Sequence, residues 1–148
     1  MFRYSSLAAA SILVGVACSG GPTKGGPDAS ATPQASAAAP GVATPDAGGR
    51  IITVEMETQP DGSNLYTPAQ VQAKRGDVIR YLLVTGVHNA SFTADSNPGK
   101  QGLPPTPQLL QLPGQTYDVK VDLAPGTYYF HCDPHALLGM TGHLTVTE

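Results

Sequence analysis

The chain has 148 residues, of which 13% are charged and 6% are aromatic, and its formal net charge is −3 at pH 7. This length accommodates one domain of ordinary size. The negative charge argues against a nucleic-acid-binding protein, which needs a basic face. Two cysteines are too few for a disulfide framework or a four-thiolate zinc site, and no apolar run reaches the roughly 18 residues that a membrane-spanning helix requires.

Residues 1–18 have the features of an export signal. Arg3 supplies a positive start, and residues 7–17 form an apolar stretch that is too short to span a bilayer but typical of a signal-peptide core. Small residues before Cys18 resemble the processing site of bacterial lipoproteins. Cys18 then either carries a lipid or is a free thiol left by ordinary cleavage. We expect lipidation, and therefore an exported protein anchored to a membrane in the bacterial periplasm or at the cell surface.

Residues 19–49 differ from the rest of the chain in composition. Of these 31 residues, 26 are Gly, Pro, Ala, Ser or Thr, and none is aromatic, Leu or Ile. Such a segment cannot bury enough apolar surface to offset the entropy of ordering it. The sequence therefore predicts a disordered tether over residues 19–49 and a single domain over residues 50–148.

The domain is predicted to be all-β. Alternating or β-branched runs predict strands at residues 51–56, 78–84, 117–123, 127–132 and 141–147. In the second run Ile79, Tyr81 and Leu83 are expected to face inward. Residues 95–114 hold five Pro and three Gly, which predicts a long connection with one short helical turn near Leu109 and Leu110. Short strands separated by turns are typical of a β-sandwich or barrel.

The chemistry is concentrated near the C-terminus, where Cys132, His135 and Met140 fall within nine residues. Thiolate and thioether sulfurs are soft ligands that favour copper over zinc or magnesium. His88, just past the strand at residues 78–84, is the candidate for a fourth ligand. Cys132 alone or Met140 alone is more often a core residue, and His88 alone indicates nothing. Together, one Cys, two His and a weak axial Met make up the ligand set of a type 1 (blue) copper centre.

Several stretches resemble the plastocyanin branch of the cupredoxins. These stretches are His88-Asn89, Pro113-Gly114-Gln115-Thr116-Tyr117, Pro125-Gly126-Thr127-Tyr128-Tyr129-Phe130-His131-Cys132-Asp133-Pro134-His135 and Gly139-Met140-Thr141-Gly142. The resemblance implies an eight-stranded Greek-key β-sandwich with His88, Cys132, His135 and Met140 as copper ligands. It also implies a hydrogen bond between Asn89 and Asp133, which stands where the family usually has Ser or Thr. A carboxylate there is expected to favour Cu(II) and lower the reduction potential.

Four protein ligands leave no open position for a substrate, so the expected function is one-electron transport and not catalysis. We expect a monomer whose redox partners are a cytochrome, oxidase or reductase. The electron is expected to leave through His135. Its neighbours Pro134, Ala136, Leu137 and Leu138 are expected to form a docking patch, although Leu137 or Leu138 could equally be buried in the core. His131 and His143 are expected to be surface residues that do not bind the metal.

The alternative function is a copper-binding or copper-delivery lipoprotein. A site that releases copper is expected to be exposed and rich in Met and His. The domain contains only two methionines, Met56 and Met140, which disfavours this alternative. A metal-free adhesion sandwich is disfavoured by the ligand set.

Overall fold

The computed structural model describes residues 42–148. The predicted export signal, Cys18 and the first part of the predicted tether lie outside the described residues. The described chain forms seven strands and one short 3-10 helix: β1 (Ile51–Thr58), β2 (Asn64–Thr67), β3 (Gln70–Lys74), β4 (Val78–Leu83), β5 (Thr116–Lys120), β6 (Gly126–His131), η1 (Ala136–Leu138) and β7 (Thr141–Thr147).

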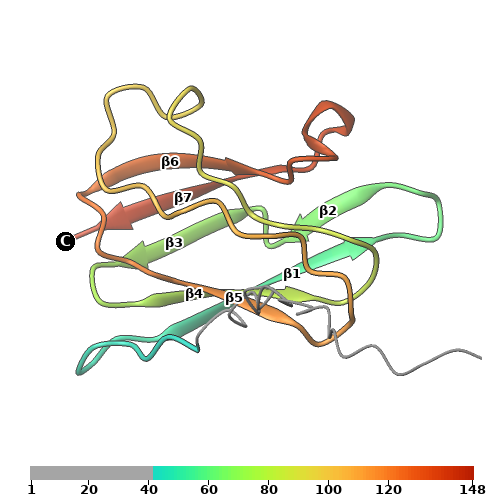
Figure 1. Ribbon diagram of the computed structural model, residues 1–148. Coiled ribbons are helices and arrows are strands. Elements are labelled where there is room, and N and C mark those ends of the chain that lie inside the picture. The colour runs from blue at the N-terminus through green and yellow to red at the C-terminus, as the bar shows by residue number, and fades with distance from the viewer. Residues whose placement is uncertain (1–41) are drawn as a thin grey trace, which may run out of the picture. The chain divides into compact units, whose positions relative to one another are not determined.

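The strands form two sheets that face each other (Figure 1). One sheet has the order β2-β1-β4-β5 and the other has the order β3-β7-β6. The pairs β1–β4 and β3–β7 are parallel, whereas β1–β2, β4–β5 and β6–β7 are antiparallel. The predicted all-β sandwich is therefore confirmed.

Each sheet buries one face of its alternating strands. Ile79, Tyr81 and Leu83 of β4 all point into the core, as predicted, and β7 buries Leu144 and Val146 in the same manner. Aromatic rings fill the space between the sheets, and Tyr66, Tyr81 and Phe130 contact one another edge to face, with ring centroids 4.9 to 6.2 Å apart. Such geometry adds to the stabilisation that burial alone provides.

The sequence did not predict strands β2 and β3, and two further details of the predicted elements are wrong. The described residues hold seven strands, not eight, because residues 84–115 contribute only isolated bridges, such as Ser91 with His131. The prolines in that segment have no N–H to donate to a ladder. The expected helical turn near Leu109 and Leu110 is also absent, since Leu110 forms a bridge with His88.

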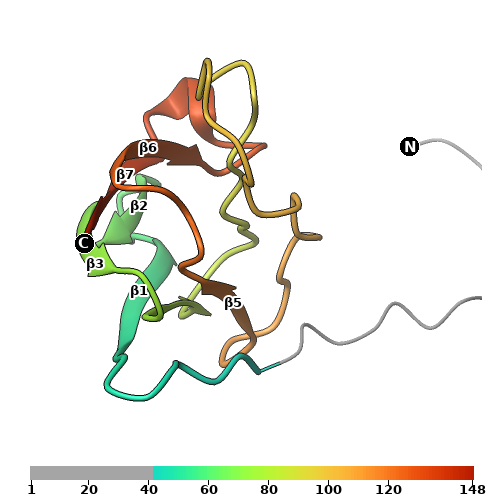
Figure 2. The same ribbon diagram turned by 90° about the vertical axis from the view of Figure 1, so that its left-hand side faces the viewer.

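The long connection between β4 and β5 runs along the side of the molecule where the edge strands β5 and β6 lie (Figure 2). The side chain of Asn97 pairs with the edge of β6, since it donates to Tyr129 O at 2.9 Å and accepts from Tyr129 N–H at 2.7 Å. At the other edge, the Tyr117 hydroxyl donates to Pro105 O at 2.8 Å. The connection thus covers strand edges that would otherwise be open to pairing with another chain.

The ordered domain begins before Arg50. The Ala43 N–H donates to Asp118 Oδ2 at 2.8 Å, and Asp46 forms an ion pair with Lys120 at 2.8 Å. The Asp46 N–H also donates to Gly76 O at 2.9 Å. The last residues of the predicted tether are therefore attached to the domain. Among residues 42–148, no helix is long and apolar enough to cross a membrane.

Candidate metal centre

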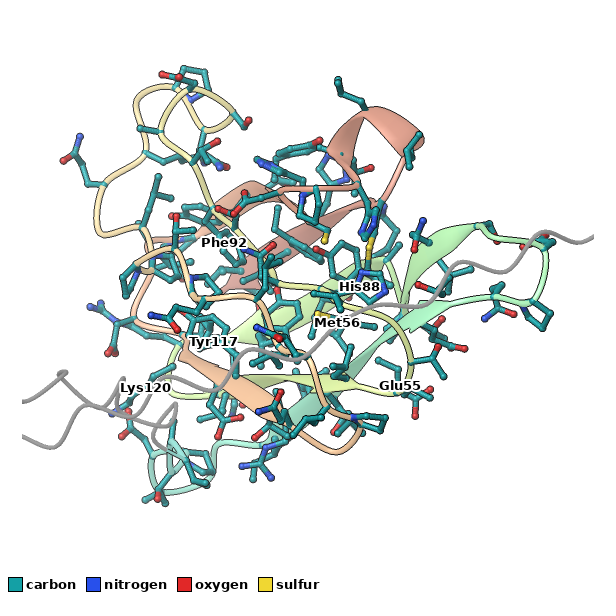
Figure 3. The ribbon with its side chains drawn as sticks, turned by 45° about the vertical axis from the view of Figure 1, so that its right-hand side comes forward. Glu55, Met56, His88, Phe92, Tyr117 and Lys120 are labelled. Carbon is teal, nitrogen blue, oxygen red and sulfur yellow. The ribbon has the colours of Figure 1, made fainter. Side chains whose placement is uncertain are left out.

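The donor side chains come from two loops at one end of the sandwich. His88 follows β4 on the long connection and is fully buried. Its backbone is fixed by two hydrogen bonds with Leu110, from His88 N–H to Leu110 O at 3.2 Å and from Leu110 N–H to His88 O at 2.8 Å. Figure 3 shows His88 beside the buried Met56 near the ends of β1 and β2.

The second loop joins β6 to β7 and is closed by its own backbone. The His135 N–H donates to Cys132 O at 3.0 Å, the Met140 N–H donates to His135 O at 3.1 Å, and the Cys132 N–H donates to Met140 O at 3.1 Å. Gly139 takes a left-handed conformation with φ of 91°, which ends η1 and turns the chain back toward Met140. Cys132 and Met140 are fully buried, whereas His135 is partly exposed.

Three donor atoms converge between the loops. Nδ1 of His88 and Nδ1 of His135 are 3.1 Å apart, and Cys132 Sγ lies 3.6 and 3.4 Å from them, respectively. Nitrogen and sulfur donors about 2.0 to 2.3 Å from one ion, at near-tetrahedral angles, are separated by roughly 3.3 to 3.6 Å. The three observed separations lie within about 0.2 Å of this range. Cys132 forms no disulfide within the described residues. The arrangement therefore fits a single soft metal ion.

The protonation states of the metal-free donors follow from burial. Burial lowers the pKa of His88 to about 4, and the nearby His135 imidazole acts in the same direction. Burial also raises the pKa of the Cys132 thiol, an effect that the backbone N–H groups of Asn89 and His135 partly offset. At neutral pH His88 is therefore neutral and Cys132 is a thiol, so a bound cation must displace the thiol proton.

Asn89 joins the two loops. Its Nδ2 donates to Asp133 Oδ2 at 2.7 Å, and its Oδ1 accepts from the Asp133 N–H at 2.9 Å. The predicted Asn89–Asp133 hydrogen bond is therefore confirmed. The Asn89 carbonyl also accepts from the buried Tyr66 hydroxyl at 2.6 Å. Tyr66 was not recognised in the sequence, where nothing connects it to either loop.

Thr58 is a second residue that contacts the donor loops and that the sequence did not reveal. Its Oγ1 lies 3.1 Å from Nε2 of His88, on the side of the ring opposite the other donors. Thr58 ends β1 and is 30 residues away from His88 in the chain. No signal in the sequence connects Thr58 with His88. In the structure, an added Cβ on Gly86 would collide with Thr58 Oγ1 and lie 2.6 Å from His88 Nε2, so glycine at this position leaves room for the contact.

The side chains predicted to form the docking patch lie around His135. Leu137 is fully exposed, Leu138 is 71% exposed and Pro134 is exposed, whereas Ala136 is partly buried. Neither leucine is therefore buried in the core. Val87, Leu109 and Leu112 are also exposed apolar side chains. Val87 and Leu109 directly precede His88 and Leu110, which form a bridge with each other. Exposed apolar side chains therefore also flank His88 in the chain.

His131 and His143 do not belong to the donor cluster, which consists of His88, Cys132 and His135 among the described residues. His131 points away from the donors, as expected, but it is less exposed than a surface residue usually is, because its side chain is only 14% exposed and its Nε2 lies 3.3 Å from Asp133 Oδ1. His143 is half-buried, with its ring against Tyr129 at 5.5 Å between centroids. Both imidazoles pack within the outer face of the β3-β7-β6 sheet.

A two-layer β-fold with one thiol and two imidazoles at its end defines a copper-binding protein of the cupredoxin class. Residues 53–147 match the family of copper binding proteins described as plastocyanin/azurin. The chain belongs to this family, and its cofactor is copper. The resemblance stated from the sequence is therefore confirmed.

Individual relatives agree with this assignment. The chain is 38% identical over 91 residues to the plastocyanin of Vicia faba, a match that covers 58% of this chain and 91% of that protein. It is 37% identical over 91 residues to the chloroplastic plastocyanin of Pisum sativum, and it spans only 54% of that protein's length.

Solved structures show the same fold. The oxidised plastocyanin of Dryopteris crassirhizoma superposes with a TM-score of 0.52 at 28% identity, covering 64% of this chain and 99% of that one. The pseudoazurin of Methylobacterium extorquens superposes with a TM-score of 0.52 at 30% identity, covering 66% of this chain and 76% of that one.

Proposed function

We propose that this protein is a one-electron carrier whose single type 1 copper ion is held by His88, Cys132, His135 and Met140. The observation that carries the proposal is the convergence of three donor atoms, from loops 44 residues apart in the chain, at distances of 3.1 to 3.6 Å. The burial of Met140 in the same loop supports its role as a weak axial ligand.

Bound copper supplies a couple between Cu(I) and Cu(II), and the protein limits how far the ligands move between the two states. The backbone hydrogen bonds among Cys132, His135 and Met140 close the second loop, and the Leu110 bridge fixes His88. Four protein donors leave no open position for a substrate. This donor set favours electron transfer over catalysis.

The proposed route of the electron is the His135 imidazole. His135 is the one donor of the cluster that is partly exposed, since His88 and Cys132 are buried. The docking patch around it is apolar, with Pro134, Leu137 and Leu138 exposed. Electron-transfer encounters use small and weak interfaces, and a patch of this kind suits a brief contact with a redox protein such as a cytochrome, an oxidase or a reductase.

The proposed location is outside the cytoplasm, on a membrane. The export signal of residues 1–18 and the cysteine at its end support a lipid anchor at Cys18. A tether rich in Gly, Pro and Ala would leave the domain free to rotate toward partners. A serine in place of Cys18 should release the full-length protein from membranes, and unchanged membrane retention would contradict the anchor.

The test of the copper centre is to add Cu(II) to the full-length chain and record its visible and EPR spectra. We expect intense blue absorption and a narrow copper hyperfine splitting. Tightly bound but colourless copper would overturn the electron-carrier proposal and favour copper delivery. Leu138→Glu should slow electron exchange with a redox partner while leaving the blue colour intact, and loss of the colour would mean that Leu138 supports the fold.

A further inference from the structure

The His88 ring makes polar contacts through both of its nitrogens. Nδ1 faces the other donors, His135 and Cys132. Nε2 faces the opposite way, toward Thr58 Oγ1 at 3.1 Å. A ring nitrogen that binds metal needs its lone pair free, so the proton of the neutral ring must be on the other nitrogen.

The hydrogen-bond partners of Thr58 decide which way its hydroxyl points. Thr58 Oγ1 lies 2.7 Å from Asn64 Oδ1, to which it donates its only proton. The Asn64 amide is oriented in turn, because its Nδ2 donates to Gly62 O at 3.3 Å and leaves Oδ1 for Thr58. The Thr58 oxygen can therefore only accept a hydrogen bond from the His88 ring. The proton of His88 must therefore be on Nε2, which leaves Nδ1 as the donor atom.

Thr58 is itself held firmly at this place. It lies directly opposite Asn64 in the antiparallel pair of β1 and β2. Its N–H donates to Thr85 O at 3.2 Å and to Thr85 Oγ1 at 3.0 Å, and its carbonyl accepts from the Thr85 hydroxyl at 3.0 Å. Thr85 is the second residue of the connection that carries His88. The strand end and the ligand loop are thus fixed to each other by backbone as well as side-chain contacts.

We propose that Thr58 is a positioning residue of the metal centre, with Asn64 orienting its hydroxyl so that the His88 ring is held with Nδ1 toward the copper. This proposal rests on the proposed role of His88 as a ligand. Partners that hold the outer nitrogen of a ligating imidazole fix its tautomer and orientation before metal arrives. The Thr85 backbone also forms a hydrogen bond with His88 that raises the pKa of the ring. Removing the Thr58 hydroxyl should therefore loosen the orientation of the His88 ring without abolishing it.

The test compares three variants of the full-length chain. Thr58→Val removes the hydroxyl and keeps the shape, and Thr58→Ser restores a hydroxyl. Thr53→Val is the matched control, because it makes the same change on the same strand at an exposed position. NMR of the histidine nitrogens in the metal-free and Cu(I) forms reports the tautomer and the solvent exchange of the Nε2 proton. Competition with a chromophoric chelator reports the affinity for Cu(I).

In the wild type and in Thr58→Ser we expect a slowly exchanging proton on Nε2 of His88. In Thr58→Val this proton should exchange about tenfold faster, and Cu(I) should bind about 10- to 100-fold more weakly. If Thr58→Val behaves like Thr53→Val in both measurements, the proposal is overturned. A protonated Nδ1 in the metal-free wild type would overturn it as well.

The design separates this proposal from the proposed function. The tautomer of metal-free His88 and the affinity for Cu(I) can be measured even if the wild type gives no blue copper spectrum. If the blue spectrum is absent but Thr58→Val still weakens Cu(I) binding and speeds exchange of the Nε2 proton, the electron-carrier proposal fails alone. If Thr58→Val does not fold, Asn64→Leu provides the second variant. It leaves the Thr58 hydroxyl in place but removes the acceptor that orients it, and we expect faster Nε2 proton exchange. Unchanged exchange in Asn64→Leu would contradict the role of Asn64.

Discussion

Asn89 and Asp133 form a reciprocal pair across the metal centre, in which Asn89 both donates to the Asp133 carboxylate at 2.7 Å and accepts from the Asp133 N–H at 2.9 Å. Asn89 follows one proposed ligand and Asp133 follows another. The pair therefore fixes the separation of the two ligand loops and also places a carboxylate beside the copper centre. The fold determines the geometry of this pair, whereas the negative charge belongs to Asp133 alone.

Replacing Asp133 with serine should raise the reduction potential of the copper. The carboxylate is 43% exposed, so its interaction with the added positive charge of Cu(II) is partly screened. We expect about 1 kcal/mol, which corresponds to roughly 40 mV for one electron. Cyclic voltammetry of the wild type and Asp133→Ser measures this shift. Asp122→Ser removes an exposed carboxylate outside the metal loops and should leave the potential unchanged. A potential that is equal in all three proteins would contradict the electrostatic argument.

Two buried tyrosines should respond in opposite ways to loss of the hydroxyl. The Tyr81 hydroxyl has no hydrogen-bond partner among the described residues, whereas Tyr66 donates to Asn89 O at 2.6 Å. Tyr81→Phe should leave the free energy of unfolding unchanged or raise it by up to about 1 kcal/mol, while Tyr66→Phe should lower it by about 1 to 3 kcal/mol. Urea denaturation measures both. Equal destabilisation by the two changes would show that Tyr81 has a partner such as a buried water.

The metal-free protein should lose stability as the pH falls from about 6.5 to about 4. Burial lowers the pKa of His88 from 6.5 to about 4, so in this window the unfolded chain takes up a proton that the folded chain does not. The free energy of unfolding should fall by up to about 3 kcal/mol across the window. Denaturation curves at several pH values measure the slope. His88→Gln should flatten it, and a slope that persists in this variant would assign the effect to another group.

Gly86 should tolerate no side chain, for a reason beyond its backbone conformation. Gly86 and Gly62 have nearly the same left-handed φ, 88° and 85°. A Cβ on Gly62 meets nothing within 4 Å, whereas a Cβ on Gly86 would collide with Thr58 Oγ1 and lie 2.6 Å from His88 Nε2.

Gly62→Ala should therefore cost only the backbone strain, about 1 to 2 kcal/mol. Gly86→Ala should cost more than this and should also weaken copper binding and alter the EPR spectrum. Chelator competition and EPR on both variants make the comparison. Similar copper affinities in the two variants would show that the loop relaxes around the added methyl group.

Local patterns in the sequence were sufficient for the class of fold and for naming all four proposed ligands, although His88 was named only from its place just past a predicted strand and from the resemblance. Cys132, His135 and Met140 lie on one short loop, so their spacing alone brings them together. The alternation of β4 and β7 correctly indicated which side chains are buried, because the two faces of a strand differ at every second residue. The strands β2 and β3 were missed, since each offers few apolar residues and Pro68 separates them.

The tertiary structure decided what lies behind and around the ligands. Thr58 contacts His88 only because β1 pairs with both β2 and β4 in a particular register. The packing of His131 against Asp133 and the exposure of Leu138 depend on which segments of the chain lie over β6 and over the loop that follows it. Periodicity reports which side of a strand is buried, but a contact across strands depends on their register and on the path of the connections. The sequence by itself therefore identified a soft-metal loop on a β-sandwich, and only the folded chain brought that loop to His88 and placed Thr58 and Asn64 behind the His88 ring.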